Sequence, residues 1–235
     1  LLGCGRSDKP KLTYNSFLYV QLITEFIRDV IGEPANIIAT GKSVAPVIMA
    51  TKLKEELVNR IILINPSDLE ELNDVPSKFD TLKKHNFTVG AILLTHGHFD
   101  HVGAVRDLAA TIGCNVYMRP EETAMPPQLT AGPLYFTHEY PTEGKLQVAG
   151  MDILVMHTPG HTAGSVCLLV ENAMFSGDTL FAGSMGRCDF PGSSIFDMRK
   201  SLRRLCALST DYRVFPGHGP SSTLDHEKKT NPYLR

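Results

Sequence analysis

Apolar residues recur with helical spacing in four segments of the chain, at residues 17–31, 44–57, 102–112 and 195–208. This periodicity predicts a helix over each of them. Short apolar runs bounded by turn residues predict strands. They lie at residues 36–39, 61–65, 90–94, 115–117, 151–156, 165–170, 173–175 and 213–215. Strands interleaved with helices predict a mixed α/β fold.

The polar segment after the apolar run 91–94 holds the densest group of potential metal ligands. Its sequence is THGHFDH over residues 95–101, so that His96, His98, Asp100 and His101 fall within six residues. Imidazole nitrogens suit zinc and iron, and a carboxylate suits a harder metal position. A buried strand followed by this spacing predicts a metal-binding loop.

Three more potential ligands follow other apolar runs. His161 comes after the run 153–156, Asp178 after 173–175 and His218 after 214–215. Side chains at strand ends lie on loops that rigid elements hold in place. We therefore expect all the candidate ligands at one edge of a sheet system.

These motifs together resemble the metallo-β-lactamase-fold hydrolase superfamily, and most of all its small glyoxalase II-like members. The resemblance covers residues 88–235 and includes GDTLF at 177–181 and GRCD at 186–189. It implies an αββα sandwich and a metal hydrolase domain over residues 76–235. It also implies a thioesterase-class enzyme (EC 3.1.2-like, of the hydroxyacylglutathione hydrolase type) that cleaves thioesters or small acyl esters.

The resemblance further implies a binuclear centre in which every ligand position is filled. One ion would take His96, His98 and His161, the other would take Asp100, His101 and His218, and Asp178 would bridge both. Two divalent ions roughly 3.5–4 Å apart can activate a bridging hydroxide as the nucleophile. Zinc is favoured, with iron or manganese as alternatives. Asp100 and Asp178 are the expected catalytic residues, and Asp100 would pass a proton to the leaving group.

Two charged residues after Asp178, Arg187 and Asp189, are further candidates. They could pair with each other, steady the metal loop or meet a substrate carboxylate, and a simple surface salt bridge is the competing interpretation. The remaining histidines are expected to be structural, although the position of His157 before a predicted ligand loop suits a hydrogen bond to that loop. They are His85, His138, His157 and His226.

Two other functions remain open. Iron-dependent persulfide dioxygenases share the 95–101 loop and the Gly-Arg-x-Asp segment, but the sequence PGHGP at 216–220 is more typical of two-metal hydrolases. A truncated fusion without activity is the second alternative. Glyoxalase II proper continues into a helical domain that helps to bind glutathione, whereas this chain ends at Arg235, so glutathione as the thioester carrier is in doubt.

Residues 1–75 resemble a fragment of an α/β-hydrolase, a βαβ segment in place of the usual first strands of the metal domain. Within it, GKSVA at 41–45 occupies the place of a nucleophile elbow. A serine hydrolase also needs an oxyanion loop, an acid and a histidine, and the chain supplies none convincingly. We therefore expect a non-catalytic N-terminal domain in which Ser43 caps or packs at the start of a helix.

The composition and charge of the chain indicate which classes of binding partner to expect. The chain has 235 residues, a net charge of −2 and no dense Lys/Arg stripe, which argues against nucleic acid and favours a small-molecule substrate. No apolar run approaches the ~20 residues that span a membrane. The five cysteines are scattered without paired spacing, which favours reduced thiols and a cytoplasmic location. The oligomeric state stays open.

Overall fold

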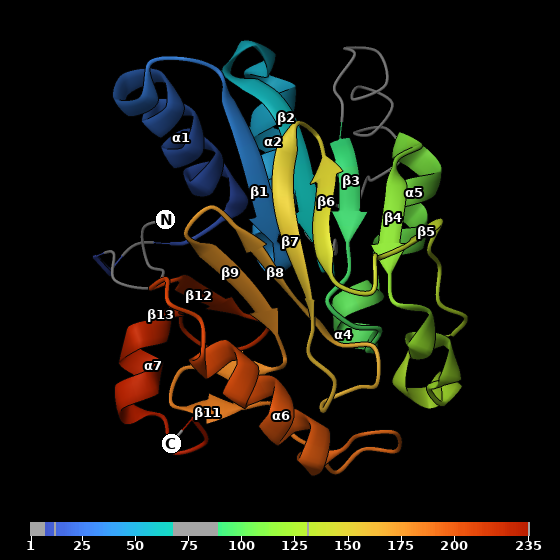
Figure 1. Ribbon diagram of the computed structural model, residues 1–235. Coiled ribbons are helices and arrows are strands. Elements are labelled where there is room, and N and C mark those ends of the chain that lie inside the picture. The colour runs from blue at the N-terminus through green and yellow to red at the C-terminus, as the bar shows by residue number, and fades with distance from the viewer. Residues whose placement is uncertain (1–7, 12, 68–88, 131, 235) are drawn as a thin grey trace. The chain divides into compact units, whose positions relative to one another are not determined.

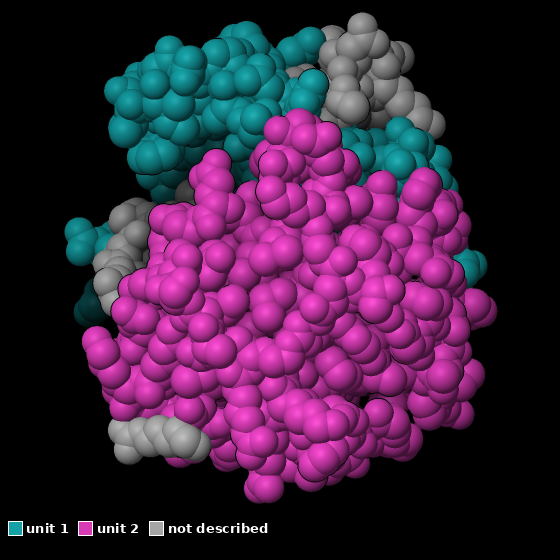
Figure 2. All heavy atoms as spheres, viewed as in Figure 1, with its two compact units in different colours: residues 1–93, 102–116 teal, residues 94–101, 117–235 magenta. Residues whose placement is uncertain are grey.

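The computed structural model describes residues 8–11, 13–67, 89–130 and 132–234 (Figure 1). The chain forms two compact units, shown in different colours in Figure 2. Unit 1 comprises residues 1–93 and 102–116, and unit 2 comprises residues 94–101 and 117–235. The predicted domain boundary between residues 75 and 76 lies outside the described residues and stays a prediction.

Parallel strands form the centre of unit 1. They are β1 (Ala35–Thr40), β2 (Val58–Ile64) and β3 (Val89–Leu93). Strand β2 pairs with both others, so that Ile37 lies opposite Ile61 and Ile62 opposite Ala91. A strand flanked on both sides reads as a continuous apolar run, because both of its faces are buried. The order β1, α2 (Val44–Leu53), β2 is the βαβ arrangement expected for this segment.

The helices of unit 1 follow the predicted periodicity with altered ends. Helix α1 (Ser16–Phe26) is capped by Asn15 and continues as a π-helical turn, Ile27–Ile31, which ends at Gly32. The predicted helix 44–57 stops at Leu53, because Lys54 leaves the helical conformation before a short 3₁₀ turn, Glu55–Leu57. The predicted helix 102–112 is α5 (Val105–Ile112), which starts later than predicted because α4 (Phe99–Val102) precedes it.

Unit 2 is built on a six-stranded sheet with the order β13-β12-β9-β8-β7-β6. The strands are β6 (Gly144–Val148), β7 (Met151–His157), β8 (Val166–Val170), β9 (Ala173–Gly177), β12 (Arg213–Pro216) and β13 (Ser222–Thr223). Strands β6 to β9 are antiparallel to their neighbours, and β12 runs parallel to β9. Strands β7, β9 and β12 therefore point the same way, and their carboxyl ends meet at one edge.

Strand β6, which the apolar pattern did not predict, forms a hairpin with β7. The pairing of Val148 with Met151 leaves a two-residue turn in which Ala149 and Gly150 have φ angles of 51° and 70°. Positive φ at both central positions defines the tight turn that matches the twist of a β-hairpin. Between β4 (Asn115–Met118) and β6, the described residues form 3₁₀ turns and the short strand β5 (His138–Glu139), which pairs with β4.

Helix α6 (Ile195–Cys206) covers an apolar cluster of unit 2. Its Met198, Leu202 and Leu205 are buried together with Leu169 and Met174 of the sheet. Ser194 caps the helix by accepting a hydrogen bond from the Asp197 amide. The remaining elements are a small hairpin, β10 (Leu180–Phe181) and β11 (Ser184–Met185), and helix α7 (Leu224–Thr230). The mixed α/β class is confirmed.

Candidate metal centre

The predicted ligands lie at the ends of strands that run in one direction. His161, Asp178 and His218 follow β7, β9 and β12, so they meet at the edge where the carboxyl ends of these strands lie. The segment 94–101 joins the same unit through backbone hydrogen bonds. The Leu94 amide donates to the Tyr117 carbonyl, and the Val166 amide donates to the Thr95 carbonyl.

All seven predicted ligands come together in unit 2. Among the described residues, three groups have potential ligand atoms within 4.8 Å of one another. They are His96–His98–His161, His96–His101–Asp178 and Asp100–His101–His218. The first and third are the sets that the sequence assigned to the two ions.

Asp178 lies between those two sets. Its Oδ2 is 3.6 Å from His161 Nε2 in the first set and 3.5 Å from His218 Nε2 in the other. Its Oδ1 is 3.4 Å from His101 Nε2. Within the sets, His98 Nδ1 and His161 Nε2 are 2.8 Å apart, and His218 Nε2 is 3.0 Å from Asp100 Oδ2. Asp178 therefore contacts imidazoles of both sets, and its bridging role stays a prediction.

Burial keeps the four buried imidazoles of the cluster neutral. Desolvation lowers the pKa of His96 and His161, and it lowers the pKa of His98 to about 4 and of His101 to about 3. Neutral imidazole is the form that binds metals. His161 Nδ1 lies 2.8 Å from the Arg187 carbonyl, which can only accept, so this nitrogen carries the proton and Nε2 keeps its lone pair.

Two buried atoms in the cluster lack a hydrogen-bond partner, and both are potential ligand atoms. They are His96 Nε2 and Asp178 Oδ1. Burial also raises the pKa of Asp178 to about 7. A buried carboxylate surrounded by neutral rings is costly unless a cation compensates it. Five imidazoles and two carboxylates are a donor set for divalent ions, so these residues fit the metals that the motifs predict.

Gly217 leaves the space that Asp178 occupies. A Cβ atom at this position would lie 2.1 Å from Asp178 Oδ1 and 2.7 Å from His101 Cε1. Such distances are far below van der Waals contact. The glycine of the 216–220 motif is therefore required by the packing of the cluster itself.

Arg187 and Asp189 pair with each other. The guanidinium donates two hydrogen bonds to the carboxylate, at 2.6 and 2.7 Å, and both side chains are exposed. The guanidinium carbon also lies 4.1 Å from the centre of the Phe190 ring, which in turn lies 5.3 Å from the ring of His98. It is the backbone carbonyl of Arg187, not its side chain, that contacts a predicted ligand.

The other singled-out side chains lie in local hydrogen bonds. His157 Nε2 is 2.9 Å from the carbonyl of Ala163, in the loop that carries His161. Ser43 Oγ donates to the Thr40 carbonyl at 2.8 Å and accepts from the Thr40 amide at 2.9 Å, at the start of α2. His138 contacts Thr137 Oγ1, and His226 lies in the first turn of α7. His85 falls outside the described residues.

Glu122 is a buried residue near the site that the sequence did not single out. It lies in the 3₁₀ turn Pro120–Ala124 and is fully buried. Its carboxylate accepts hydrogen bonds from the amides of Gly97 and Gly164. The local sequence Pro-Glu-Glu-Thr is typical of an exposed helix start, so it gives no indication that Glu122 is buried.

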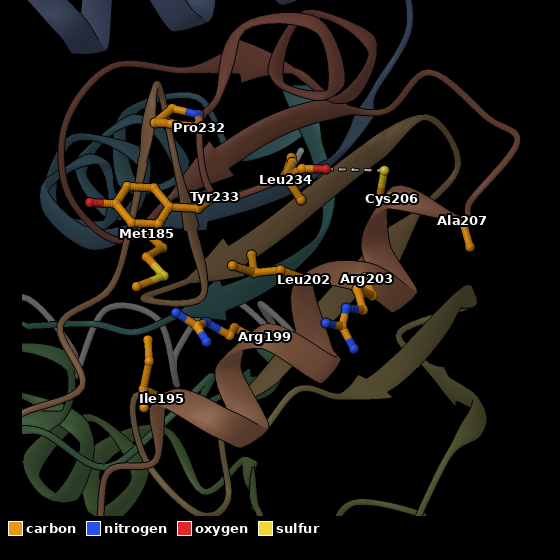
Figure 3. A pocket seen from close by; sticks show the side chains of 10 residues that line it. All are labelled: Met185, Ile195, Arg199, Leu202, Arg203, Cys206, Ala207, Pro232, Tyr233 and Leu234. Carbon is orange, nitrogen blue, oxygen red and sulfur yellow. Dashed lines mark hydrogen bonds between the residues drawn. The ribbon is translucent and has the colours of Figure 1, made fainter.

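A separate cavity of about 630 Å³ lies between α6 and the residues that follow α7. In Figure 3, Arg199, Leu202 and Arg203 extend from α6 on one side, and Tyr233 and Leu234 lie on the other. None of the seven predicted ligands lines this cavity. The histidine cluster is therefore a distinct site.

Residues 69–218 match the family model of the metallo-beta-lactamase superfamily. The chain belongs to this superfamily. Its members are mostly metal-dependent hydrolases and typically bind divalent metals, in keeping with the histidine-rich groups described above. None of the described helices is long and apolar enough to cross a membrane.

Two relatives illustrate the similarity in sequence. A probable metallo-hydrolase of Streptococcus pyogenes serotype M6 is 35% identical over 194 residues, which cover 74% of this chain and 81% of that protein. The hydroxyacylglutathione hydrolase GloC of Haemophilus influenzae is 32% identical over 168 residues, covering 65% of this chain and 79% of GloC.

Solved structures show the same fold. The BLEG-1 B3 metallo-beta-lactamase has a TM-score of 0.63 and 32% identity, covering 74% of this chain and 88% of that one. TTHA1623, crystallised in a di-iron-bound form, has a TM-score of 0.59 and 35% identity, covering 73% and 88%. ETHE1 from Myxococcus xanthus has a TM-score of 0.58 and 25% identity, covering 74% and 73%. The metallo-beta-lactamase fold expected from the motifs is confirmed.

Proposed function

We propose that the chain is a two-metal hydrolase that cleaves thioesters or small acyl esters. The convergence of seven side chains into two sets, with Asp178 between them, carries this proposal. His96, His98 and His161 would hold one ion, and Asp100, His101 and His218 the other. When bound, two such ions supply an activated water and polarise the carbonyl that is attacked.

The acyl substrate class is supported by a named relative. The Haemophilus influenzae protein is named a hydroxyacylglutathione hydrolase. The sequence similarity to this chain extends over 79% of that protein. Thioester hydrolysis needs no serine or cysteine nucleophile when metals activate water. That agrees with the position of Ser43, whose hydroxyl is bound to the backbone of Thr40.

Asp100 is suited to move a proton at the rim of the cluster. Its side chain is 36% exposed, and its Oδ2 lies 3.0 Å from Nε2 of His218, which is 53% exposed. A carboxylate that meets both the cluster and solvent can accept a proton from the attacking water at Oδ2 and return it to the leaving thiolate. Asp178, which is buried, has no such route to the leaving group.

Metal quantification combined with a thioester panel tests the proposal. We expect about two zinc-like ions per chain, together with hydrolysis of several thioesters that is lost on chelation and restored by the metal. One iron without a second metal, with oxygen consumed in the presence of a persulfide, would support the dioxygenase alternative instead. The structural similarity to ETHE1 is the reason to include that assay.

Glutathione recognition needs its own measurement. Steady-state kinetics on S-lactoylglutathione and on a thioester with a truncated carrier compare the same bond with and without remote contacts. A preference above about a hundredfold in kcat/KM, or about 2.7 kcal/mol, would show a site for the carrier. A smaller preference would identify the acyl group as the part that is recognised.

A further inference from the structure

Glu122 places a fully buried carboxylate between two loops of unit 2. Its Oε2 accepts a hydrogen bond from the Gly97 amide at 2.6 Å, and its Oε1 accepts one from the Gly164 amide at 2.7 Å. These partners lie 25 and 42 residues away in the chain. Both carboxylate oxygens are thus occupied by backbone donors from different loops.

Those two loops supply the whole first set of predicted ligands. Gly97 lies between His96 and His98, and Gly164 lies in the loop of His161. The spacing between the loops determines where His98 Nδ1 and His161 Nε2 meet, which is at 2.8 Å. The other set shares the Gly97 loop through Asp100 and His101, but its third member, His218, follows β12 and lies outside both loops that Glu122 joins.

The residues around Glu122 provide space and hydrogen-bond donors for its carboxylate. A Cβ atom at Gly164 would lie 2.7 Å from Glu122 Oε1, so this glycine makes room for the carboxylate, whereas a Cβ atom at Gly97 would first meet Met125 at 2.8 Å. Burial raises its pKa, while hydrogen bonds from Thr162 and the two glycine amides lower it. The neighbouring cation, Arg119, is paired with Glu121 instead. The buried carboxylate therefore depends on the amides that it joins.

We propose that Glu122 is a positioning residue that sets the separation of the two loops and so the affinity for the ion held by His96, His98 and His161. This inference rests on the metal site of the proposed function. Groups that orient metal ligands without touching the ion typically change its affinity 10–100-fold when they are replaced. Glu122 acts through the backbone of the ligand loops.

The variant Glu122→Gln tests this role with almost no change in shape. Glutamine keeps one acceptor oxygen but presents an NH₂ group to the second backbone amide. One of the two hydrogen bonds that join the loops is therefore lost. We expect at least about tenfold weaker binding of the first ion, whose ligands all lie on the two joined loops, and a smaller loss for the second. The measurement is titration of the metal-free protein with Co²⁺, followed by its visible spectrum and by competition with a chelator.

Single-site backgrounds assign the affected ion. His218→Ala weakens the second set and leaves the first intact, whereas His161→Ala does the reverse. Glu122→Gln should lower Co²⁺ affinity at least about tenfold in the first background and clearly less in the second. Glu121→Gln removes the same charge from the adjacent residue and should change neither. Glu122→Asp, which is one methylene shorter and cannot span both amides, provides a second variant if the glutamine protein does not fold.

Each outcome separates the two proposals. A wild-type protein that binds no ion refutes the proposed function and this inference with it. Two ions in the wild type with unchanged affinities in both Glu122 variants refute only the role of Glu122. Equal weakening of both ions, together with a lower unfolding temperature, would make Glu122 a general structural residue and would also overturn the inference.

Discussion

Asp178 is the residue on which both sets of predicted ligands depend. It is buried, its carboxylate lies within 3.6 Å of imidazoles from each set, and burial alone would favour its protonated form. Positive charge close to the carboxylate would reverse that preference. The negative charge of Asp178, more than its shape, is therefore what the site requires.

Asp178→Asn should release at least one ion and remove most of the hydrolytic activity. The amide has nearly the same shape but no charge to place between two cations. Metal content and thioester turnover are measured side by side, with Asp197→Asn on the surface of α6 as the matched control. Normal turnover with both ions retained would contradict a bridging role for Asp178.

Replacing Ser43, unlike replacing Asp178, is expected to leave the activity unchanged. Its hydroxyl is held by both backbone groups of Thr40, which leaves it as part of the turn that begins α2. Ser43→Ala should leave thioester hydrolysis unchanged, and a serine-directed phosphonate should not label the wild-type protein. Covalent labelling at Ser43, combined with loss of activity in the alanine variant, would revive the serine-hydrolase interpretation.

At the element scale, α6 supports the loop that carries His161. Ser193 Oγ donates to the His161 carbonyl, the Ser194 amide donates to the Gly160 carbonyl, and Ser201 Oγ donates to the Pro159 carbonyl. A Cβ atom at Gly160 would lie 2.5 Å from the Cα of Met198, so the loop and the helix are in direct backbone contact. The position of His161 thus depends on a helix that starts more than thirty residues later.

Ser201→Ala should lower the free energy of unfolding by about 1–3 kcal/mol. The serine is buried, and its removal leaves the Pro159 carbonyl without this donor. Urea denaturation monitors the change through the transition midpoint. Ser221→Ala, at an exposed position, should stay within about 0.5 kcal/mol of the wild type. Identical midpoints for the two variants would show that the contact contributes nothing.

At the scale of the whole molecule, the buried histidines couple stability to pH. In the metal-free protein their pKa values are lowered, to about 4 for His98 and about 3 for His101, whereas an unfolded histidine titrates near ~6.5. Between these values the unfolded chain binds more protons than the folded one. The contribution of these histidines to stability is therefore fully present above pH ~6.5 and is lost as the pH drops towards their lowered pKa values. The raised pKa values of Asp178 and Glu122 act in the opposite direction, but four imidazoles outnumber them.

The melting temperature of the chelator-treated protein should accordingly fall between pH 7 and pH 5 more steeply than that of a variant in which one buried ring is removed. His98→Gln is the suitable comparison, with His138→Gln, whose ring is exposed, as the control. Added metal should raise the melting temperature most at neutral pH, because protons compete with the ion for the same nitrogens. A flat profile for the metal-free wild type would contradict the lowered pKa values.

The sequence by itself determined the family, the mixed α/β class and the candidate ligands. Apolar runs carry the strands, and each candidate ligand follows such a run directly, so the information is local. Helix ends and the β6–β7 hairpin were less well predicted, because a backbone change at Lys54 and a turn at Ala149–Gly150 decide them. The boundary at residues 75 and 76 remains a prediction.

The tertiary structure alone decided how these side chains meet. The common direction of β7, β9 and β12 places Asp178 between the two sets, and Arg187 turns to Asp189 and not to a ligand. Glu122 had no local signal at all, because its partners Gly97 and Gly164 are brought to it only when distant loops pack together. A buried polar residue is recognised by the groups that satisfy it, and those groups are adjacent only in the folded chain.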